Sequence, residues 1–551
     1  MLGVPDSGRA DPPPSRTRQD ARARSRRSRR AGRLVDTGLV CALVVVSVVV
    51  HDPHRMLTQP LWRDENWVAV SVRAPIDQVF RLTSTTPVLF TALLRVTPHS
   101  SPAGLRILPL VFTAACVIPA WLLGRELDPG HRLTAVVLGV TVALAPALLA
   151  RHDLKQYTAE TFTTLVLAWL IARLERCWST RRLVALAVVL ATSTLLSNAS
   201  MFLAVAVLVG LAGPLALRRS WPRLRQLGIV GLGIVAFDAL VFVLVDRPGD
   251  TPALRAYWAG SYVPLHSGVA DALHFLHFQA GAELQAVGLG PSLVAAALIV
   301  LGLVVLVRSG FAALALVVPL VAIEQVAAAT AHRYPLWNDR TSTWFTVLLA
   351  VVAMIGVSGL ARIVRSGVRG PDRRWVAVAR IASGVVLAIL VVTLATPTIR
   401  AMRTAADSTT PLEDVHGQVQ TIRAQERPGD VVVANVDAGF GLGVYWPAQP
   451  RFPTHLARLD TFRIDYPPAD RVVVAATIST AAEVAAVRHA VAQARPAGRV
   501  WVVFSHWHTA ERQTMVTELL RFGTLSTPTG QHGLEPVQLL TLGPDGPSAG
   551  P

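Results

Sequence analysis

The stretch 34–51, LVDTGLVCALVVVSVVVH, decides the fold class of this chain, because its apolar run is long enough to cross a membrane. A helix rises about 1.5 Å per residue, so roughly 20 apolar residues span the ~30 Å hydrocarbon core of a bilayer. Comparable runs recur along the 551 residues, of which 52% are hydrophobic and only 16% are charged. A soluble core cannot hide that much apolar surface. The chain is therefore predicted to be a polytopic α-helical membrane protein.

The sequence predicts about eleven membrane-spanning helices, most of them roughly 17 to 22 residues long. They are expected near residues 34–51, 103–123, 133–150, 158–173, 183–197, 199–217, 227–245, 286–307, 310–330, 343–361 and 376–397. The first run ends without a small-residue cleavage site, which indicates an uncleaved anchor rather than a signal peptide. The arginine-dense segment before it, residues 1–33, has no periodic apolar face and is predicted to be a disordered tail.

The distribution of arginine predicts the orientation in the membrane. Clusters of arginine in the tail and in alternate short loops are expected to face the cytoplasm, which places the N-terminus inside. Eleven crossings from residue 34 to 397 then place residues 398–551 outside the cell, whereas an even number of crossings would reverse that side. The net charge of +17 resides largely in these segments, where anionic lipid headgroups attract it. Nucleic acid is therefore not predicted as a partner.

Residues 398–551 differ in character from the apolar part of the chain. Short β-branched runs at 430–435, 471–476 and 499–504 predict buried strands, and residues 481–495 and 512–522 predict helices. This alternation indicates a small extracytoplasmic α/β domain with a largely parallel sheet. Gly439, Gly441 and Gly443 are predicted to lie in a loop after the first strand. Their spacing does not predict a dinucleotide site, because no helix convincingly follows.

Two adjacent acids, Asp64 and Glu65, are the first candidate functional residues. They lie between Trp62 and Trp67, in the predicted external loop that follows the first span. A carboxylate at the outer mouth of a membrane protein can accept a proton from a substrate held at the lipid surface. Neither a transport helix nor a packing residue requires acids at that position.

The short external loop before the fourth span carries the only lysine of the chain, Lys155, among 52 lysines and arginines. Lysine offers a compact charge that can meet one phosphate oxygen, whereas arginine prefers a planar two-pronged contact. A lysine that extends to the membrane interface is the competing interpretation. Tyr157 can likewise offer a hydroxyl or a stacking face for a sugar, or be an ordinary residue of the aromatic belt.

A third cluster, residues 332–340, is predicted to lie outside between the ninth and tenth spans. It includes Arg333, Tyr334 and Arg340. Guanidinium groups near the headgroup plane can form charge-assisted hydrogen bonds with a lipid-linked phosphate or pyrophosphate. Anchoring at the membrane interface is the alternative. Within the spans, Asp238 is an acid near the middle of a predicted helix, where a role or a partner is expected.

Taken together, these segments resemble the GT-C glycosyltransferases, which include protein O-mannosyltransferases, aminoarabinose transferases and bacterial mannosyltransferase-like membrane proteins. The resemblance covers about residues 34–397. It rests on Arg63-Asp64-Glu65, on Thr86-Pro87-Val88-Leu89-Phe90, on His152-Asp153-Leu154-Lys155-Gln156-Tyr157-Thr158-Ala159-Glu160, and on Arg333-Tyr334-Pro335 with Arg340. The C-terminal α/β segment lies outside these motifs, so its role stays open.

The resemblance implies transfer of a sugar from a polyprenyl-phosphate donor to a glycan, lipid or protein acceptor at the outer face of the membrane, typically with inversion. It implies that Asp64 is the catalytic carboxylate and that Glu65 orients it, binds acceptor or helps to hold a divalent ion. The expected phosphate-binding residues are Lys155, Arg333 and Arg340. The expected substrate-binding residues are Asp153, Tyr157, Glu160 and Tyr334.

The sequence does not choose a cofactor. Some relatives use a divalent cation and others do not, and this chain has no compact ligand motif, so no metal is predicted. Two alternatives to a transferase stay open. One is a transporter or flippase for a lipid-linked saccharide, which would use external cations and an intramembrane acid. The other is an inactive relative whose external domain is a scaffold for envelope assembly.

Overall fold

The computed structural model describes most of the chain. The described residues are 16–82, 86–149, 151, 153–247, 252–367, 392–393, 396, 399–400, 413–447, 450–452, 464–475, 480–495, 498–506, 509–529 and 535–543. The last predicted span, 376–397, lies almost entirely outside them. So do residues 83–85 and His152, which belong to two loops that the sequence predicts to be external.

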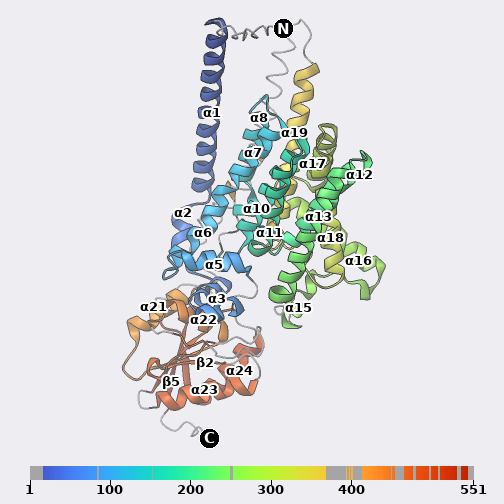
Figure 1. Cartoon of the computed structure of the whole chain (residues 1–551). Helices are drawn as coiled ribbons and strands as arrows, with labels where there is room; N and C mark the ends of the chain where they lie inside the picture. Colours follow the sequence, from blue (N-terminus) through green and yellow to red (C-terminus); the bar gives the residue numbers. More distant parts are fainter. Residues whose placement is uncertain are drawn as a thin grey trace, which may run out of the picture.

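The N-terminal two-thirds of the described chain is helical (Figure 1). The α-helices are α1 (Arg16–Val50), α2 (Pro53–Thr58), α3 (Arg63–Val72), α4 (Ile76–Leu82), α5 (Val88–Val96), α6 (Pro102–Ala115), α7 (Val117–Leu127), α8 (Leu133–Ala143), α9 (Pro146–Leu149), α10 (Tyr157–Arg176), α11 (Thr180–Leu196), α12 (Ser200–Leu217), α13 (Trp221–Val241), α15 (Pro252–Tyr257), α16 (Val269–Ala286), α17 (Ser292–Arg308), α18 (Ala312–Thr330) and α19 (Thr343–Gly367). A π-helical turn, η1 (Phe242–Asp246), extends α13, and two 3₁₀ turns, η2 (Ala259–Ser261) and η3 (Leu265–Ser267), precede α16.

Each predicted span up to 343–361 coincides with one of these helices or with a broken pair. Among the described residues, six helical segments are long and apolar enough to cross a membrane, and α17 and the pair α8–α9 are shorter apolar segments. The chain is thus a polytopic membrane protein, as predicted. The number of eleven crossings stays a prediction.

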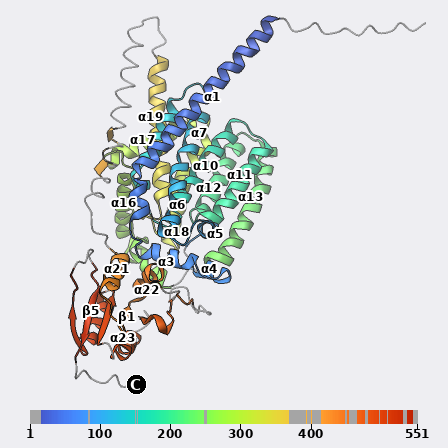
Figure 2. The same ribbon diagram turned by 90° about the vertical axis from the view of Figure 1, so that its left-hand side faces the viewer.

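The prediction of a disordered tail is wrong for residues 16–33, because α1 begins at Arg16 and continues without a break into the first apolar run. Alanine and arginine both favour the helical state, so an apolar helix can continue into such a segment. α1 lies at the periphery of the bundle in both views (Figures 1 and 2).

The centre of the bundle is built around α19, where Trp344 is fully buried and the side chains through Ile355 are almost all buried. α19 packs closely against α17, because Gly302 and Gly356 face each other where a Cβ atom would meet the neighbouring backbone. Small residues permit this close approach of membrane helices, where packing replaces the hydrophobic effect as the stabilising force.

The C-terminal part of the chain forms a five-stranded sheet of order β2-β1-β3-β5-β4. Its strands are β1 (Val431–Ala434), β2 (Val472–Val474), β3 (Arg499–Val503), β4 (Gly523–Ser526) and β5 (Gln538–Leu542). The first three are parallel, and β5 and β4 add antiparallel pairs at one edge. The helices around the sheet are α21 (Val415–Gln425), α22 (Val436–Tyr445), α23 (Thr480–Ala494) and α24 (Thr509–Leu519), with a 3₁₀ turn, η5 (Pro468–Asp470).

Alternate residues of the strands face two separate hydrophobic cores. Val431 and Val433 pack with α23 and α24, whereas Val432 and Ala434 pack with α21 and α22. The core formed with α21 and α22 also contains Val70 and other residues of the first loop after α1. α3 is therefore a structural part of the C-terminal sheet unit. In Figure 1, α3 lies between the helical bundle and the sheet.

The three predicted strands and the helix at 481–495 are confirmed, but the predicted glycine loop is wrong. Gly439, Gly441 and Gly443 belong to α22, which Asn435 caps by accepting a hydrogen bond from the Ala438 amide at 3.1 Å. These glycines are required by close packing rather than by a turn. A Cβ atom on Gly441 would lie 2.6 Å from Val415, and one on Gly443 would lie 2.6 Å from Val70. The antiparallel strands β4 and β5 were not predicted.

Candidate functional site

The first turn of α3 carries both predicted acids and directs them to different surroundings. The helix begins at Arg63, and its positive N-terminal end favours acidic residues in the first turn. Successive residues of a helix are about 100° apart around its axis, so adjacent side chains cannot share one environment. Asp64 and Glu65 therefore have separate roles.

Glu65 is 1% exposed and forms a buried ion pair with Arg106 of α6. Its Oε1 accepts hydrogen bonds from Arg106 Nε at 3.0 Å and from the Leu154 amide at 3.1 Å. Its Oε2 accepts from Arg106 and from the Trp62 amide at 3.3 Å. Glu65 thus ties α3, α6 and the segment that carries Lys155 together, and both carboxylate oxygens are engaged.

Asp64 lies among cations that come from distant parts of the sequence. Its Oδ1 is 3.2 Å from Arg63 Nη1, and its Oδ2 forms an ion pair with Arg340 Nη2. Arg340 also lies over the Trp62 ring, with its guanidinium carbon 4.6 Å from the ring centroid. The Asp64 side chain keeps 13% of its surface exposed, so the carboxylate borders solvent instead of being enclosed.

Lys155 completes this charge cluster. It is 6% exposed, and its Nζ lies 5.3 Å from the centroid of the Trp67 ring, in the geometry of a cation–π contact. Trp67 in turn stacks on Phe440 of α22, with ring centroids 6.2 Å apart. The charge of Lys155 also favours the ionised form of the Asp64 carboxylate.

The electrostatics of the cluster favour a charged Asp64. Burial disfavours the ionised carboxyl, but Lys155, Arg63 and Arg340 outweigh burial and lower the pKa of Asp64 below its usual range. For Lys155, burial lowers the pKa of the amine, Asp64 raises it, and Arg340 lowers it further. Asp64 thus faces three cations, and one of them, Arg63, also pairs with Asp437.

Asp153 lies beside the same cluster in a different state. Burial raises the pKa of its carboxyl, and the neighbouring Arg151, Arg340 and Lys155 only partly offset this. Within the described residues, neither carboxylate oxygen has a hydrogen-bond partner. Arg151 itself pairs with Asp339, with 2.9 Å between Nη2 and Oδ2. Asp153 is therefore a buried acid with unused hydrogen-bonding capacity next to Asp64 and Lys155.

The other predicted substrate-binding residues have structural contacts. Glu160 accepts a hydrogen bond from the Asn198 amide at 3.1 Å, just before the start of α12. The Tyr334 hydroxyl donates to the Thr341 carbonyl at 3.0 Å. Tyr157 is buried and interacts electrostatically with Asp153 and Arg340. A substrate-binding role for the three residues stays a prediction, and only Tyr157 borders the charge cluster through these contacts.

The two predicted phosphate-binding arginines are placed differently. Arg340 contacts Asp64 directly, whereas Arg333 is exposed on the turn after α18. Tyr334, the next residue, packs edge-on against Phe202 at 4.8 Å between centroids. A phosphate-binding role for Arg333 stays a prediction.

Several residues of the site were not singled out from the sequence. Arg106 had a usable signal, because it is a lone charge near the start of an apolar run. Asp437, whose Oδ1 lies 2.8 Å from Arg63 Nε, had none, because it is 374 residues away in the sequence. Trp62 and Trp67 flank the acids and supply the ring faces for Arg340 and Lys155.

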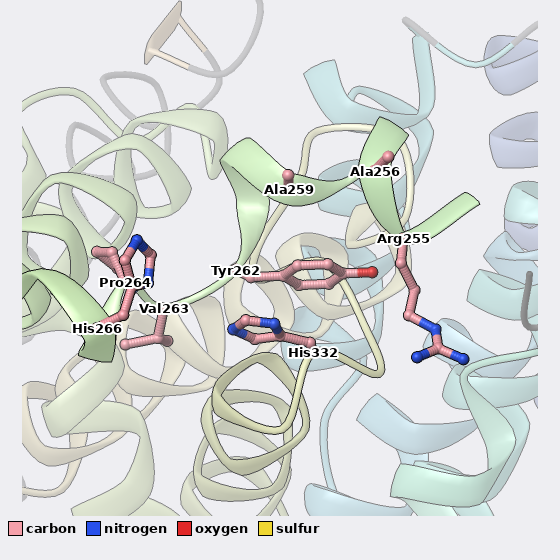
Figure 3. Close-up of a pocket in the computed structure, with 8 residues that line it drawn as sticks. All are labelled: Arg255, Ala256, Ala259, Tyr262, Val263, Pro264, His266 and His332. Carbon is pink, nitrogen blue, oxygen red and sulfur yellow. The ribbon is translucent and has the colours of Figure 1, made fainter. Parts of the chain in front are cut away.

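A pocket of about 280 Å³ lies elsewhere, between the segment after α15 and the turn after α18 (Figure 3). Tyr262 and His332 stack in parallel on one side, with ring centroids 5.0 Å apart, and Arg255 and His266 also line it. Figure 3 shows the Arg255 guanidinium extended beyond the stacked rings. Among the described residues, no group of three or more His, Cys, Asp or Glu side chains is arranged to hold a metal ion.

The bundle of apolar helices, with a charge cluster at one end, defines a polytopic membrane protein. In particular, the fold is similar to that of ArnT from Cupriavidus metallidurans bound to undecaprenyl phosphate. The TM-score is 0.51 at 14% sequence identity, and the match covers 94% of this chain and 99% of that chain. The apo state of ArnT matches with a TM-score of 0.50, 14% identity and coverage of 92% and 99%.

Arabinosyltransferase EmbB from Mycobacterium smegmatis gives a TM-score of 0.38 at 13% identity, over 67% of this chain and 41% of that chain, which is too weak to bear on the fold. No protein-family model matches the sequence, and no curated protein matches it. The resemblance inferred from the motifs is thus confirmed as a likeness of fold.

Proposed function

We propose that this protein is a membrane glycosyltransferase that moves a sugar from a polyprenyl-phosphate donor to an acceptor at the outer face of the membrane. The observation that carries the proposal is the convergence of Asp64, Lys155 and Arg340 from three segments far apart in the sequence. The fold likeness to ArnT supports it, because that protein was solved bound to undecaprenyl phosphate.

In the proposed reaction, a hydroxyl oxygen of the acceptor attacks the anomeric carbon of the donor sugar. The bond between that carbon and the phosphate oxygen breaks, and its electron pair leaves with the polyprenyl phosphate. The proton of the hydroxyl passes to Asp64, whose lowered pKa keeps it ionised and ready to accept. For Asp64 to do so, its contact with Arg340 has to loosen when substrate enters.

Lys155 and Arg340 are proposed to hold the phosphate. Negative charge grows on the phosphate as the glycosidic bond lengthens, and cations already in place stabilise it without reorganisation. With donor bound, Arg340 exchanges part of its contact with Asp64 for the phosphate. Glu65 and Arg106 hold α3 and the Lys155 segment in fixed positions relative to each other. Glu65 therefore orients the site and does not contact substrate.

The remaining parts of the proposal concern topology. The N-terminus is inside, residues 34–397 form the transmembrane domain, and residues 398–551 form an extracytoplasmic domain beside the site. The distribution of arginine among the loops supports this orientation. The proposed partners are a polyprenyl-phosphate sugar, membrane lipid and a glycan, lipid or protein acceptor.

The direct test is Asp64→Asn in full-length protein reconstituted in vesicles with a polyprenyl-phosphate sugar. Loss of the base is expected to lower sugar transfer by a factor of about 100 or more, while the protein stays folded. Asp77→Asn is the matched control, because Asp77 is an exposed acid in the same external loop. Transfer by Asp64→Asn at the wild-type rate would remove Asp64 from the catalytic role. Movement of the lipid across the bilayer without transfer would favour the flippase.

A further inference from the structure

The carboxyl ends of β1 and β3 form a place where α/β domains commonly bind ligands. In the order β2-β1-β3, the helices that follow β1 and β3 cover opposite faces of the sheet, which leaves a crevice between the two strand ends. Here the two ends are joined by Asn435, whose side chain donates to the Ser505 carbonyl at 2.9 Å and accepts from the Ser505 amide at 3.1 Å.

The group held at these strand ends is the start of α3. Arg63 Nε lies 2.8 Å from Oδ1 of Asp437, which follows β1 by three residues. The Arg63 amide donates to Glu413 Oε2 at 2.7 Å, and Glu413 Oε1 lies 2.7 Å from Nδ1 of His506, which follows β3. Both the side chain and the backbone of Arg63 are therefore bound by acids of the C-terminal segment.

The contacts continue along α3. The Tyr445 hydroxyl accepts a hydrogen bond from the Leu61 amide at 2.8 Å, just before the helix. Gly443 lies against Val70 with no room for a side chain, so α22 and α3 pack backbone to side chain. Phe440 of α22 stacks on the Trp67 ring, and the Lys155 ammonium lies over the Trp67 ring. Two routes thus lead from α22 to the charge cluster, through Arg63 to Asp64 and through Trp67 to Lys155.

We propose that the C-terminal α/β domain binds α3 at the carboxyl ends of its parallel strands as an intramolecular ligand, and that Asp437 is a positioning residue that fixes Arg63 and thereby Asp64. The position of Asp64 and of the charge cluster follows from this contact between α3 and the strand ends. The part that concerns catalysis rests on the proposed transferase function, whereas the contact itself does not.

The contact is tested by hydrogen–deuterium exchange of the α3 amides in full-length protein in nanodiscs. Asp437→Asn removes the charge and keeps the shape, and exchange in α3 rises about tenfold, the scale of one lost charge-assisted hydrogen bond. Asp430→Asn is the matched control. Asp430 pairs with Arg499 at 3.1 Å at the opposite end of β1, so its loss loosens the sheet without touching α3. Unchanged α3 exchange in Asp437→Asn, or an equal rise in both variants, would overturn the proposal.

The positioning role is tested by kinetics on the same variants. Asp437→Asn lowers kcat while KM for the donor stays within about twofold, because Lys155 and Arg340 are untouched, and Asp437→Glu restores part of kcat. Phe440→Leu instead raises KM, because Trp67 loses the ring behind it. Rates are divided by the number of sites that bind undecaprenyl phosphate, which corrects for unfolded protein. A normal kcat in Asp437→Asn overturns the positioning role, whereas a wild-type protein without transfer activity overturns only the proposed function.

Discussion

The two neighbouring acids of α3 lie in regions that differ in how completely their charges are matched. Around Glu65, one buried carboxylate meets one buried guanidinium, and backbone amides occupy what remains. Around Asp64, one carboxylate meets Arg63, Arg340 and Lys155, with part of its surface open. A saturated ion pair holds helices together. A cluster of several cations around a partly exposed carboxylate can exchange one of its contacts for an anionic ligand.

The strongest test of this comparison is to remove the charge of each acid in turn and to measure stability and activity. Glu65→Gln leaves Arg106 buried without a counter-charge, and breaking such a pair costs about 3–5 kcal/mol of the free energy of unfolding. We expect a large drop in thermal stability in detergent. Asp64→Asn is expected to keep most of the stability and to lose activity, because its side chain borders solvent and Arg63 retains Asp437.

The double variant Glu65→Gln/Arg106→Met sharpens the same point. Methionine fills much of the arginine volume without a charge, so stability is expected to recover in part relative to Glu65→Gln alone. The recovery is incomplete because the carbonyls of Met56, Gln59 and Pro60 lose the hydrogen bonds that Arg106 donates. Thermal unfolding of the four proteins of this cycle measures the coupling between the two side chains. If Asp64→Asn destabilises the protein as much as Glu65→Gln does, the distinction between the two regions is wrong.

The next largest effect concerns the anion that the Asp64 region is proposed to take. Lys155→Ala removes one charged contact to phosphate, which corresponds to a loss of about tenfold or more in affinity for undecaprenyl phosphate. Arg333→Ala is the matched comparison, because both residues are predicted phosphate ligands but Arg333 is exposed, whereas Lys155 is buried near Asp64. It is expected to change Kd by less than about twofold. Equal losses in both variants would show that the cluster does not define the phosphate site.

The sequence predicted the parts of this arrangement that depend on local pattern. Apolar runs predicted the helices, β-branched runs predicted β1 to β3, and the short motifs with their resemblance brought Asp64, Lys155 and Arg340 to attention. These inferences require only composition and spacing within a few turns of chain. The rarity of lysine singled out Lys155 without any knowledge of its neighbours.

The sequence could not predict the long-range pairs or the division of labour between the acids. Glu65 and Asp64 look equivalent in the sequence, and only the position of Arg106 on α6 makes one of them structural. The glycines of α22 signal a loop by propensity, yet tertiary packing against Val415 and Val70 overrides it. Arg333 and Arg340 share one short segment, yet Arg333 is exposed and Arg340 contacts Asp64 and Trp62.

The smallest expected effect is a pH dependence that distinguishes a buried amine from a guanidinium. Lys155 binds phosphate only when protonated, and burial lowers the pKa of its amine below the usual value of about 10.4. Affinity for undecaprenyl phosphate is therefore expected to be lost as the pH rises through this lowered pKa. Lys155→Arg is expected to extend binding to higher pH, because a guanidinium stays protonated. Titrations above pH ~7.5 avoid the second ionisation of the phosphate itself, which lies near pH ~6. If the affinity of wild type and of Lys155→Arg falls over the same alkaline pH range, the loss of binding belongs to another titrating group. Lys155 would then serve only as a support for Trp67.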